Sequence, residues 1–359
     1  MDNSTVPEDI LGQLNSHRAM NLLPNTIMLF IYIVLGILGN SAIIYIYKFR
    51  FRQTSDERFF IPYLAGIDAM ASVICSSANL IVNFNPVLYT NAALCKSFFM
   101  LSQFAASSSS LMLTIIAVQR FQLICRPFKP RMTLRNKRLC VLCTLLVVFL
   151  LSIPSVFITG IAPITNKSLN VTGYVCASVK VMGSSVFPFV YNLLVLTMCV
   201  GNLFVLCTLY VMIGKTIYGR ARYRRSMKLK PIGESSSPDG LSESCTGKTS
   251  TISETQSSTP PSASHGKFSR KMRTTGNRLS IMFLVVTLVY ILCYAPTIIA
   301  IVRSSLDKND WKDKSTTETL GFRTANTLYI INNIVNPIIY GLFDPTLRKE
   351  IIAWLSNMF

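Results

Sequence analysis

Apolar residues occur along the chain in long blocks, and short polar segments separate one block from the next. Seven blocks reach about 20 residues or more, the length that a helix needs to cross the hydrocarbon core of a bilayer. They cover approximately residues 22–47, 59–84, 95–124, 139–161, 184–213, 279–302 and a last block that ends at Tyr340. The pattern therefore predicts an all-α membrane protein, a seven-transmembrane helix bundle that occupies residues 22–343.

The segments outside these blocks are polar. Residues 1–21 lack the apolar stretch of a cleavable signal peptide, so we expect an N-terminal tail. Residues 215–278 have basic ends and a Ser/Thr/Pro-rich middle, a composition that predicts a disordered loop. Residues 344–359 are predicted to form a short amphipathic juxtamembrane helix on the membrane surface and a short tail. Alternation over residues 171–179 predicts a small hairpin between the fourth and fifth blocks.

The net charge is +19, which by itself would suit a nucleic-acid partner. The Lys and Arg residues cluster in alternate loops, however, as the positive-inside rule describes for proteins in a lipid bilayer, so we expect no nucleic acid. Glycosylation sequons at Asn3, Asn166 and Asn170 all fall on the opposite, poorly basic side. Both patterns place the N-terminus outside the cell and the C-terminus inside.

Two cysteines lie on that outer, oxidising side. Cys95 stands at the head of the third block, and Cys176 stands in the loop after the fourth. A disulfide between them would hold this loop over the mouth of the bundle, whereas the alternative is two unrelated thiols.

Enzyme chemistry finds no support in the sequence. The chain has only two histidines, and Cys140 and Cys143 sit inside an apolar block, where small buried residues explain them better than a metal site does. No phosphate-binding glycine motif and no nucleophile–base pair occurs at a recognisable spacing. We therefore expect no catalytic residues and no cofactor apart from a structural ion.

The last apolar block contains three amides, at Asn332, Asn333 and Asn336, followed by Pro337. Amides within a membrane span are costly, so they tend to face the interior of the bundle and to mark function. Pro337 removes a backbone donor and kinks the helix at this point. The alternative is an ordinary kinked span whose amides hold neighbouring helices together.

Seven motifs follow one another along the apolar blocks and the loop after the fourth block. They are Gly39-Asn40, Leu64-Ala-Gly-Ile-Asp68, Cys95, Arg120, Cys176, Cys293-Tyr-Ala-Pro296 and Asn336-Pro337-Ile-Ile-Tyr340. At these spacings the chain resembles the rhodopsin-like (class A) G-protein-coupled receptors, over all seven spans and the juxtamembrane helix. The resemblance implies a plasma-membrane receptor that binds an extracellular ligand and activates heterotrimeric G proteins.

The resemblance also implies roles for single residues. A sodium ion would be held by Asp68, Ser109, Asn332, Asn333 and Asn336. The alternative is a protonated Asp68 that is hydrogen-bonded to Asn336 and Asn40. G-protein coupling and activation would rest on Arg120, Tyr210, Pro296, Asn336, Pro337 and Tyr340. For Arg120, the alternative is snorkelling of its charge at a helix end.

Several positions depart from the family pattern. Gln119 replaces the acid that usually precedes the arginine, and Gly276 stands where a second acid often occurs. Without these partners the inactive state would lose about 1 kcal/mol or more. We therefore hypothesise ligand-independent activity, which Gln119→Asp would lower. Tyr294 replaces the usual tryptophan, so activation details cannot be carried over there.

The absence of two residues excludes some classes of ligand. Amine receptors have an aspartate where this chain has Ser102, and opsins have a lysine where it has Ile330. The hairpin loop and the segment around residues 119–128 resemble those of neuropeptide receptors, which favours a peptide. The expected pocket consists of Ser102, Gln103, Tyr294, Asn326 and Tyr329. Ordinary interhelical packing is the alternative for each of them.

Other partners and classes follow from the loops. The Ser/Thr-rich residues 235–264 would serve receptor kinases and arrestin, or would be an inert linker. A non-signalling decoy receptor is the nearest alternative function, because Gln119 departs from the signalling motif. A seven-helix transporter or channel fits less well, because the chain has no internal repeat and few charges within its spans.

Overall fold

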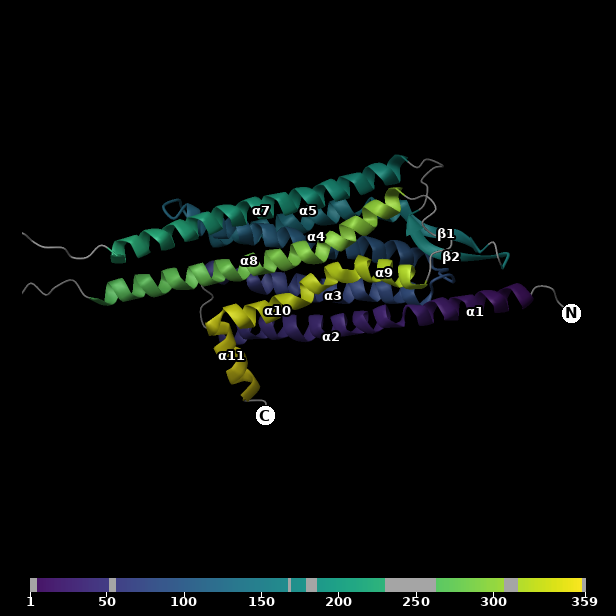
Figure 1. Cartoon of the computed structure of the whole chain (residues 1–359), viewed down its shortest axis with the longest axis horizontal. Coiled ribbons are helices and arrows are strands. Elements are labelled where there is room, and N and C mark those ends of the chain that lie inside the picture. Colours follow the sequence, from purple (N-terminus) through teal and green to yellow (C-terminus); the bar gives the residue numbers. More distant parts are fainter. Residues whose placement is uncertain are drawn as a thin grey trace, which may run out of the picture.

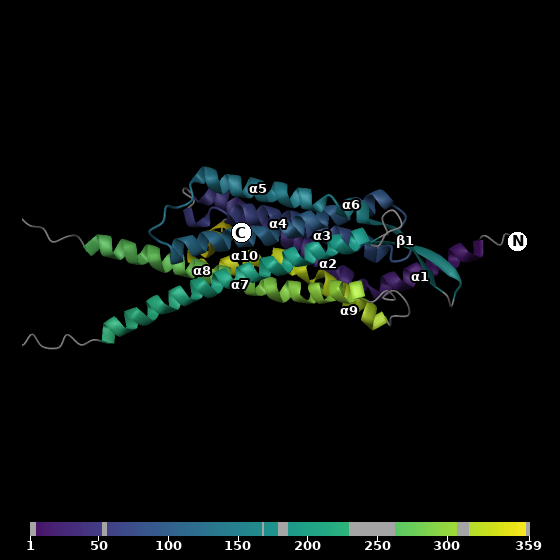
Figure 2. The ribbon, with the colours of Figure 1, turned by 90° about the horizontal axis from the view of Figure 1, so that it is seen from above.

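The computed structural model describes residues 5–51, 56–166, 169–178, 186–229, 263–306 and 316–356. Long helices run side by side, and a two-stranded hairpin lies at the end of the bundle nearest the N-terminus (Figure 1; Figure 2 gives the view from above). We name this the hairpin end and the opposite one the tail end. Among the described residues, six helices are long and apolar enough to cross a membrane.

These helices correspond to the first six apolar blocks. Their bounds are α2 Leu23–Tyr45 with the π-helical turn η1 Ile46–Arg50, α3 Ile61–Phe84, α4 Ala92–Cys125, α5 Leu134–Ser152 with α6 Ser155–Ile158, α7 Val186–Leu229 and α8 Ala263–Leu306. The last block is divided into α9 Thr316–Thr327, the 3-10 turn η3 Leu328–Ile330 and α10 Ile331–Phe343. Its first part is polar, which explains why it does not form a single apolar span.

The tails and the long loop contain more helix than the sequence predicted. Helix α1, Thr5–Asn21, occupies most of the expected N-terminal tail and runs into the line of α2 (Figure 1). Helices α7 and α8 continue to Leu229 and from Ala263, so the loop expected at residues 215–278 is shorter. Arg, Lys and Met favour helix in these extensions. The middle of that loop, residues 230–262, lies outside the described part of the chain.

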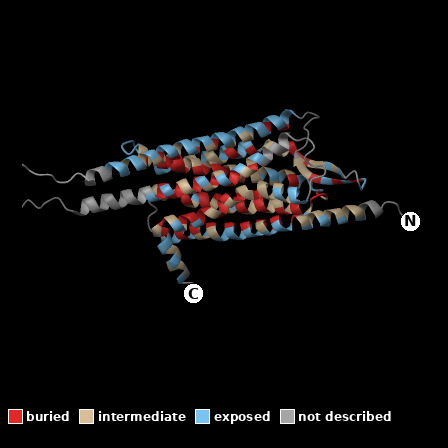
Figure 3. Ribbon diagram, viewed as in Figure 1, coloured by how far each residue is buried: buried red, intermediate tan, exposed pale blue. Residues whose placement is uncertain are grey.

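The buried residues line the inside of the bundle, whereas the outer faces of α2, α5 and α7 are exposed (Figure 3). Many of the exposed side chains are large and apolar, for example Leu38, Leu142, Phe189, Phe204 and Leu292. A surface of this kind is unstable in water and needs lipid around it. The arrangement is that of a multi-pass membrane protein.

The predicted hairpin is confirmed. Strands β1, Thr159–Asn166, and β2, Val171–Ser178, pair antiparallel. Strand β2 also reaches the segment between α3 and α4, where the Tyr174 N–H donates to the Val87 carbonyl at 2.7 Å. A Cβ atom at Gly173 would lie 2.6 Å from that carbonyl oxygen, so only glycine allows this approach.

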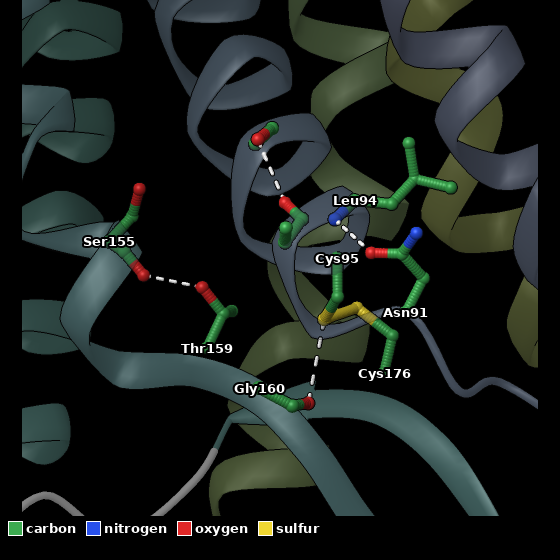
Figure 4. The surroundings of a disulfide bond; sticks show 9 residues. Asn91, Leu94, Cys95, Ser155, Thr159, Gly160 and Cys176 are labelled. Carbon is green, nitrogen blue, oxygen red and sulfur yellow. Dashed lines mark hydrogen bonds between the residues drawn. A yellow bond between two sulfur atoms is a disulfide. The ribbon is translucent and has the colours of Figure 1, made fainter.

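The predicted disulfide between Cys95 and Cys176 is also confirmed (Figure 4). Cys95 lies in the first turn of α4, where the Asn91 side chain caps the helix by accepting from the Leu94 N–H at 2.9 Å. Cys176 pairs with Ile161 in the hairpin register. The bond therefore fixes the hairpin to the start of a central helix.

Candidate functional site: a buried polar column

A carboxylate lies at the centre of the bundle. Asp68 on α3 has no exposed surface. The Ser109 hydroxyl of α4 donates to its Oδ1 at 2.6 Å, and Asn336 Nδ2 of α10 donates to its Oδ2 at 2.7 Å. Three helices thus meet at one acid, and three of the residues that the resemblance assigned to a sodium site are brought together.

The amides beside this acid leave polar atoms without partners. Asn336 Oδ1 and the side-chain oxygens and nitrogens of Asn332 and Asn333 are buried without a hydrogen-bond partner among the described residues. Asn40 Nδ2 donates to the Asn333 carbonyl at 2.9 Å and to the Gly36 carbonyl at 3.0 Å, and among the described residues it makes no hydrogen bond to Asp68. Buried polar atoms are costly unless something binds them. The three amide oxygens among these atoms are ligands of the kind that small cations take, whereas the two amide nitrogens are hydrogen-bond donors.

Helix packing around this region is tight. A Cβ atom at Gly36 on α2 would lie 2.3 Å from the Ser72 Cβ on α3, so glycine is needed for the two helices to approach. This approach places Asn40, one turn further along α2, against α10.

Arg120 lies near the tail end of α4 and is only 1% exposed. Its Nη1 is 3.9 Å from Glu57 Oε2, its Nη2 donates to the Glu57 backbone carbonyl, and its guanidinium carbon is 5.1 Å from the centre of the Phe283 ring. Glu57 belongs to the short turn η2, Asp56–Arg58. The two acids that commonly partner this arginine are absent from residues 119 and 276, and the structure places a carboxylate from another loop beside it.

The tyrosines that the resemblance assigned to activation are buried nearby. The Tyr340 ring lies 6.0 Å from that of Phe283, and its hydroxyl has no partner among the described residues. Tyr210 on α7 is 4% exposed. Pro296 and Pro337 both lie inside helices, α8 and α10 respectively. Arg120 and Tyr340 therefore share Phe283 as a neighbour.

The turn η2 has a second ionic contact. Arg58 Nε and Nη2 donate to Asp344 Oδ2 and Oδ1, each at 2.9 Å, and the two side chains are 11% and 2% exposed. Asp344 Oδ1 also accepts from the Thr346 N–H at 3.0 Å, at the start of α11, Pro345–Ser356. Helix α11 turns away from the bundle at this residue (Figure 1). Sequence reasoning missed this pair.

A hydrogen-bonded group between α4, α7 and α8 was also missed. Ser110 Oγ and Tyr290 Oη are 2.6 Å apart, and Asn202 Nδ2 donates to Ser110 Oγ at 2.7 Å. Thr114 donates to Asn202 Oδ1 at 2.5 Å. The signal in the sequence was Asn202, an amide within an apolar block.

The expected ligand residues lie closer to the hairpin end. The Tyr294 ring is 5.8 Å from that of Tyr329 and 4.4 Å from that of Tyr290. The Ser102 hydroxyl is buried without a partner among the described residues, whereas Gln103 Nε2 donates to Ser107 within α4 at 3.1 Å. Asn326 is partly buried on α9. Of the expected pocket residues, the structure thus brings Tyr294 and Tyr329 together.

Two of the three predicted glycosylation sequons lie in the hairpin. Asn166 ends β1, and Asn170 is exposed in the turn before β2, with a positive φ of 49°. Asn3 lies outside the described residues, as does most of the segment 235–264 expected to serve arrestin and kinases.

Comparisons with known proteins all identify receptors. The family model of the 7 transmembrane receptor (rhodopsin family) matches residues 39–340. The pyroglutamylated RF-amide peptide receptor of Rattus norvegicus is 22% identical over 323 residues, which cover 89% of this chain and 66% of the relative. The cholecystokinin receptor type A of Homo sapiens is 25% identical over 346 residues, which cover 89% of this chain and 77% of the relative. The chain spans less than two thirds of the RF-amide receptor's length.

Proposed function

Because the chain belongs to the rhodopsin family of seven-transmembrane receptors, we propose that it binds an extracellular peptide and activates heterotrimeric G proteins. The observation that carries this proposal is a set of three polar groups inside the bundle, which we call the buried polar column: the Tyr294–Tyr329 ring pair, the contact of Asp68 with Ser109, and the Arg120–Glu57 ion pair. Charges and amides inside a membrane bundle are costly and mark functional sites. The family is one of receptors, not enzymes.

In the proposed orientation, the hairpin end faces the outside of the plasma membrane. A disulfide at the hairpin end suits an oxidising compartment, and the basic extensions of α7 and α8 at the tail end suit the cytoplasm. The composite helix α9–η3–α10 then completes a seven-helix bundle. Helix α11 would lie on the inner membrane surface, with Trp354 5.7 Å from the ring of Tyr45.

The ligand class rests on the relatives and on the hairpin. Two relatives are receptors for peptides by name, and the disulfide holds the hairpin beside the mouth of the bundle. The proposed pocket consists of Ser102, Gln103, Tyr294, Asn326 and Tyr329. A peptide bound there would contact and displace the ring of Tyr294.

A series of side-chain contacts would transmit a conformational change from this pocket to Arg120. The ring of Tyr294 contacts that of Tyr290, and the Tyr290 hydroxyl is hydrogen-bonded to Ser110 in the group that joins α4, α7 and α8. A displacement of these rings would bend α8 at Pro296 and move Phe283 away from Arg120. Packed helices change between discrete arrangements, so a small shift at the pocket suffices to switch the tail end.

We propose that a sodium ion binds beside Asp68. The carboxylate, the Ser109 hydroxyl and the amide oxygens of Asn332, Asn333 and Asn336 would hold it, and the absence of hydrogen-bond partners for these buried amide oxygens among the described residues supports this. The ion would supply the counter-charge that a buried carboxylate needs and would hold α3, α4 and α10 together in the inactive state.

Asp68→Asn tests the ion. The wild-type unfolding midpoint should be higher in NaCl than in choline chloride of equal strength, corresponding to about 1 kcal/mol at an excess of ion over its dissociation constant. The variant should lose this difference, whereas the exposed control Asp9→Asn should retain it. A wild-type midpoint that does not distinguish the two salts would contradict the proposed site.

The function itself is tested with two peptide classes, pyroglutamylated RF-amide peptides and cholecystokinin, on membranes that display the chain. We expect saturable binding of a member of these classes together with nucleotide exchange on a G protein. Binding without exchange would indicate the decoy receptor, and ion flux would indicate the channel. Arrestin and receptor kinases would act on residues 235–264, and phosphorylation there after stimulation would support this.

A further inference from the structure

The turn η2 lies between two charges that belong to different parts of the bundle. Glu57 contacts Arg120 on α4, and the next residue, Arg58, contacts Asp344 at the junction of α10 and α11. Among the described residues, Glu57 is the one acid whose ion pair with Arg120 is observed. We propose that Glu57 is an autoinhibitory positioning residue that holds Arg120 away from the G protein until the receptor is activated. This inference rests on the proposed function.

The contact occupies the arginine from two sides. The Glu57 carboxylate lies 3.9 Å from Nη1, and the Glu57 carbonyl accepts from Nη2. Phe283 of α8 covers the guanidinium at 5.1 Å, and only 1% of Arg120 is exposed. A G-protein segment could reach this charge only after the turn and Phe283 had moved.

The turn is itself anchored. Arg58 binds Asp344 with two hydrogen bonds of 2.9 Å, and its guanidinium carbon lies 5.8 Å from the Phe51 ring. Bidentate pairs of this kind fix geometry as well as charge. Asp344 follows α10, which carries Asn336 and Tyr340, so a movement of α10 would be transmitted through Arg58 to Glu57.

If Glu57 acts in this way, the noticeable ligand-independent activity hypothesised from the sequence is not expected. The acids missing at residues 119 and 276 are not needed if Glu57 supplies the counter-charge from the first cytoplasmic loop. Low basal activity is therefore expected of the wild-type receptor, and removal of the Glu57 charge should raise it.

The test is Glu57→Gln, which keeps the size and the backbone carbonyl and removes only the charge. Binding of GTPγS to a purified heterotrimeric G protein, without peptide and at matched receptor amounts, should rise about threefold or more above wild type. The matched control is Glu350→Gln, whose carboxylate pairs with Arg50 on an exposed surface and should leave basal activity unchanged. Gln119→Asp added to Glu57→Gln should return the activity toward wild type.

A second measurement does not depend on signalling. Unfolding midpoints of Glu57→Gln, Arg120→Gln and the double variant form a cycle, in which the two changes should be non-additive if the groups interact. Additive midpoints would overturn the contact. Unchanged basal activity of Glu57→Gln in a receptor that responds to peptide would overturn the inhibitory role alone. No exchange by any variant, with or without peptide, would overturn the proposed function and this role together, even with a non-additive cycle.

Discussion

Asp344→Asn is expected to lower the stability of the protein more than any other single charge removal at the tail end. The carboxylate is 2% exposed, accepts two hydrogen bonds from Arg58 and caps the start of α11. Breaking a buried pair leaves the other charge uncompensated, at a cost of about 3–5 kcal/mol. The measurement is the unfolding midpoint of the purified protein in detergent, followed by circular dichroism.

The chain contains its own control for this prediction. Arg50 and Glu350 form a pair at 3.2 Å whose side chains are 34% and 32% exposed. Exposed pairs contribute only about 0–1 kcal/mol, so Glu350→Gln should hardly move the midpoint. Equal midpoints for the two variants would show that the Arg58–Asp344 pair is no more important than a surface pair.

Loss of the disulfide should have the second largest effect. Cys176→Ser frees the hairpin from α4 across a sequence separation of 81 residues, and disulfides typically contribute about 2–4 kcal/mol. We expect a lower unfolding midpoint and loss of peptide binding, because the hairpin would no longer be held beside the pocket. Binding and midpoint are both measured on membranes with matched receptor amounts.

Cys143→Ser is the control, since Cys143 is a free thiol on α5 that is exposed, not buried as its place in an apolar block had suggested. It should bind peptide as wild type does. Wild-type receptor treated with dithiothreitol should behave like Cys176→Ser. Full binding by Cys176→Ser would show that the hairpin stays in place without the bond.

The sequence predicted the spans well because long apolar blocks have few structural solutions other than helices in a bilayer. The hairpin and the Cys95–Cys176 bond were also predicted, the first from alternation and the second from a shared compartment. The division of the last span at η3 was not predicted, since the polar first part of that block resembled a loop.

The contacts of η2 could not be predicted from the sequence. Glu57 and Arg120 are 63 residues apart, and Arg58 and Asp344 are 286 apart. Their pairing depends on how α3, α4 and α10 pack, which no periodicity in the sequence records. The motifs identified Arg120, whereas its partner needed the structure.

In the proposed function, Arg120 couples this chain to a G protein. The most direct measurement is nucleotide exchange on purified heterotrimeric G proteins of each Gα class, with wild type and Arg120→Ala in membranes at matched amounts. We make it on the Glu57→Gln background as well, where basal exchange should be highest. We expect nucleotide exchange by the Glu57→Gln receptor, and we expect Arg120→Ala to abolish it. Exchange that persists without Arg120, or no exchange with any G protein even after peptide is added, would contradict it.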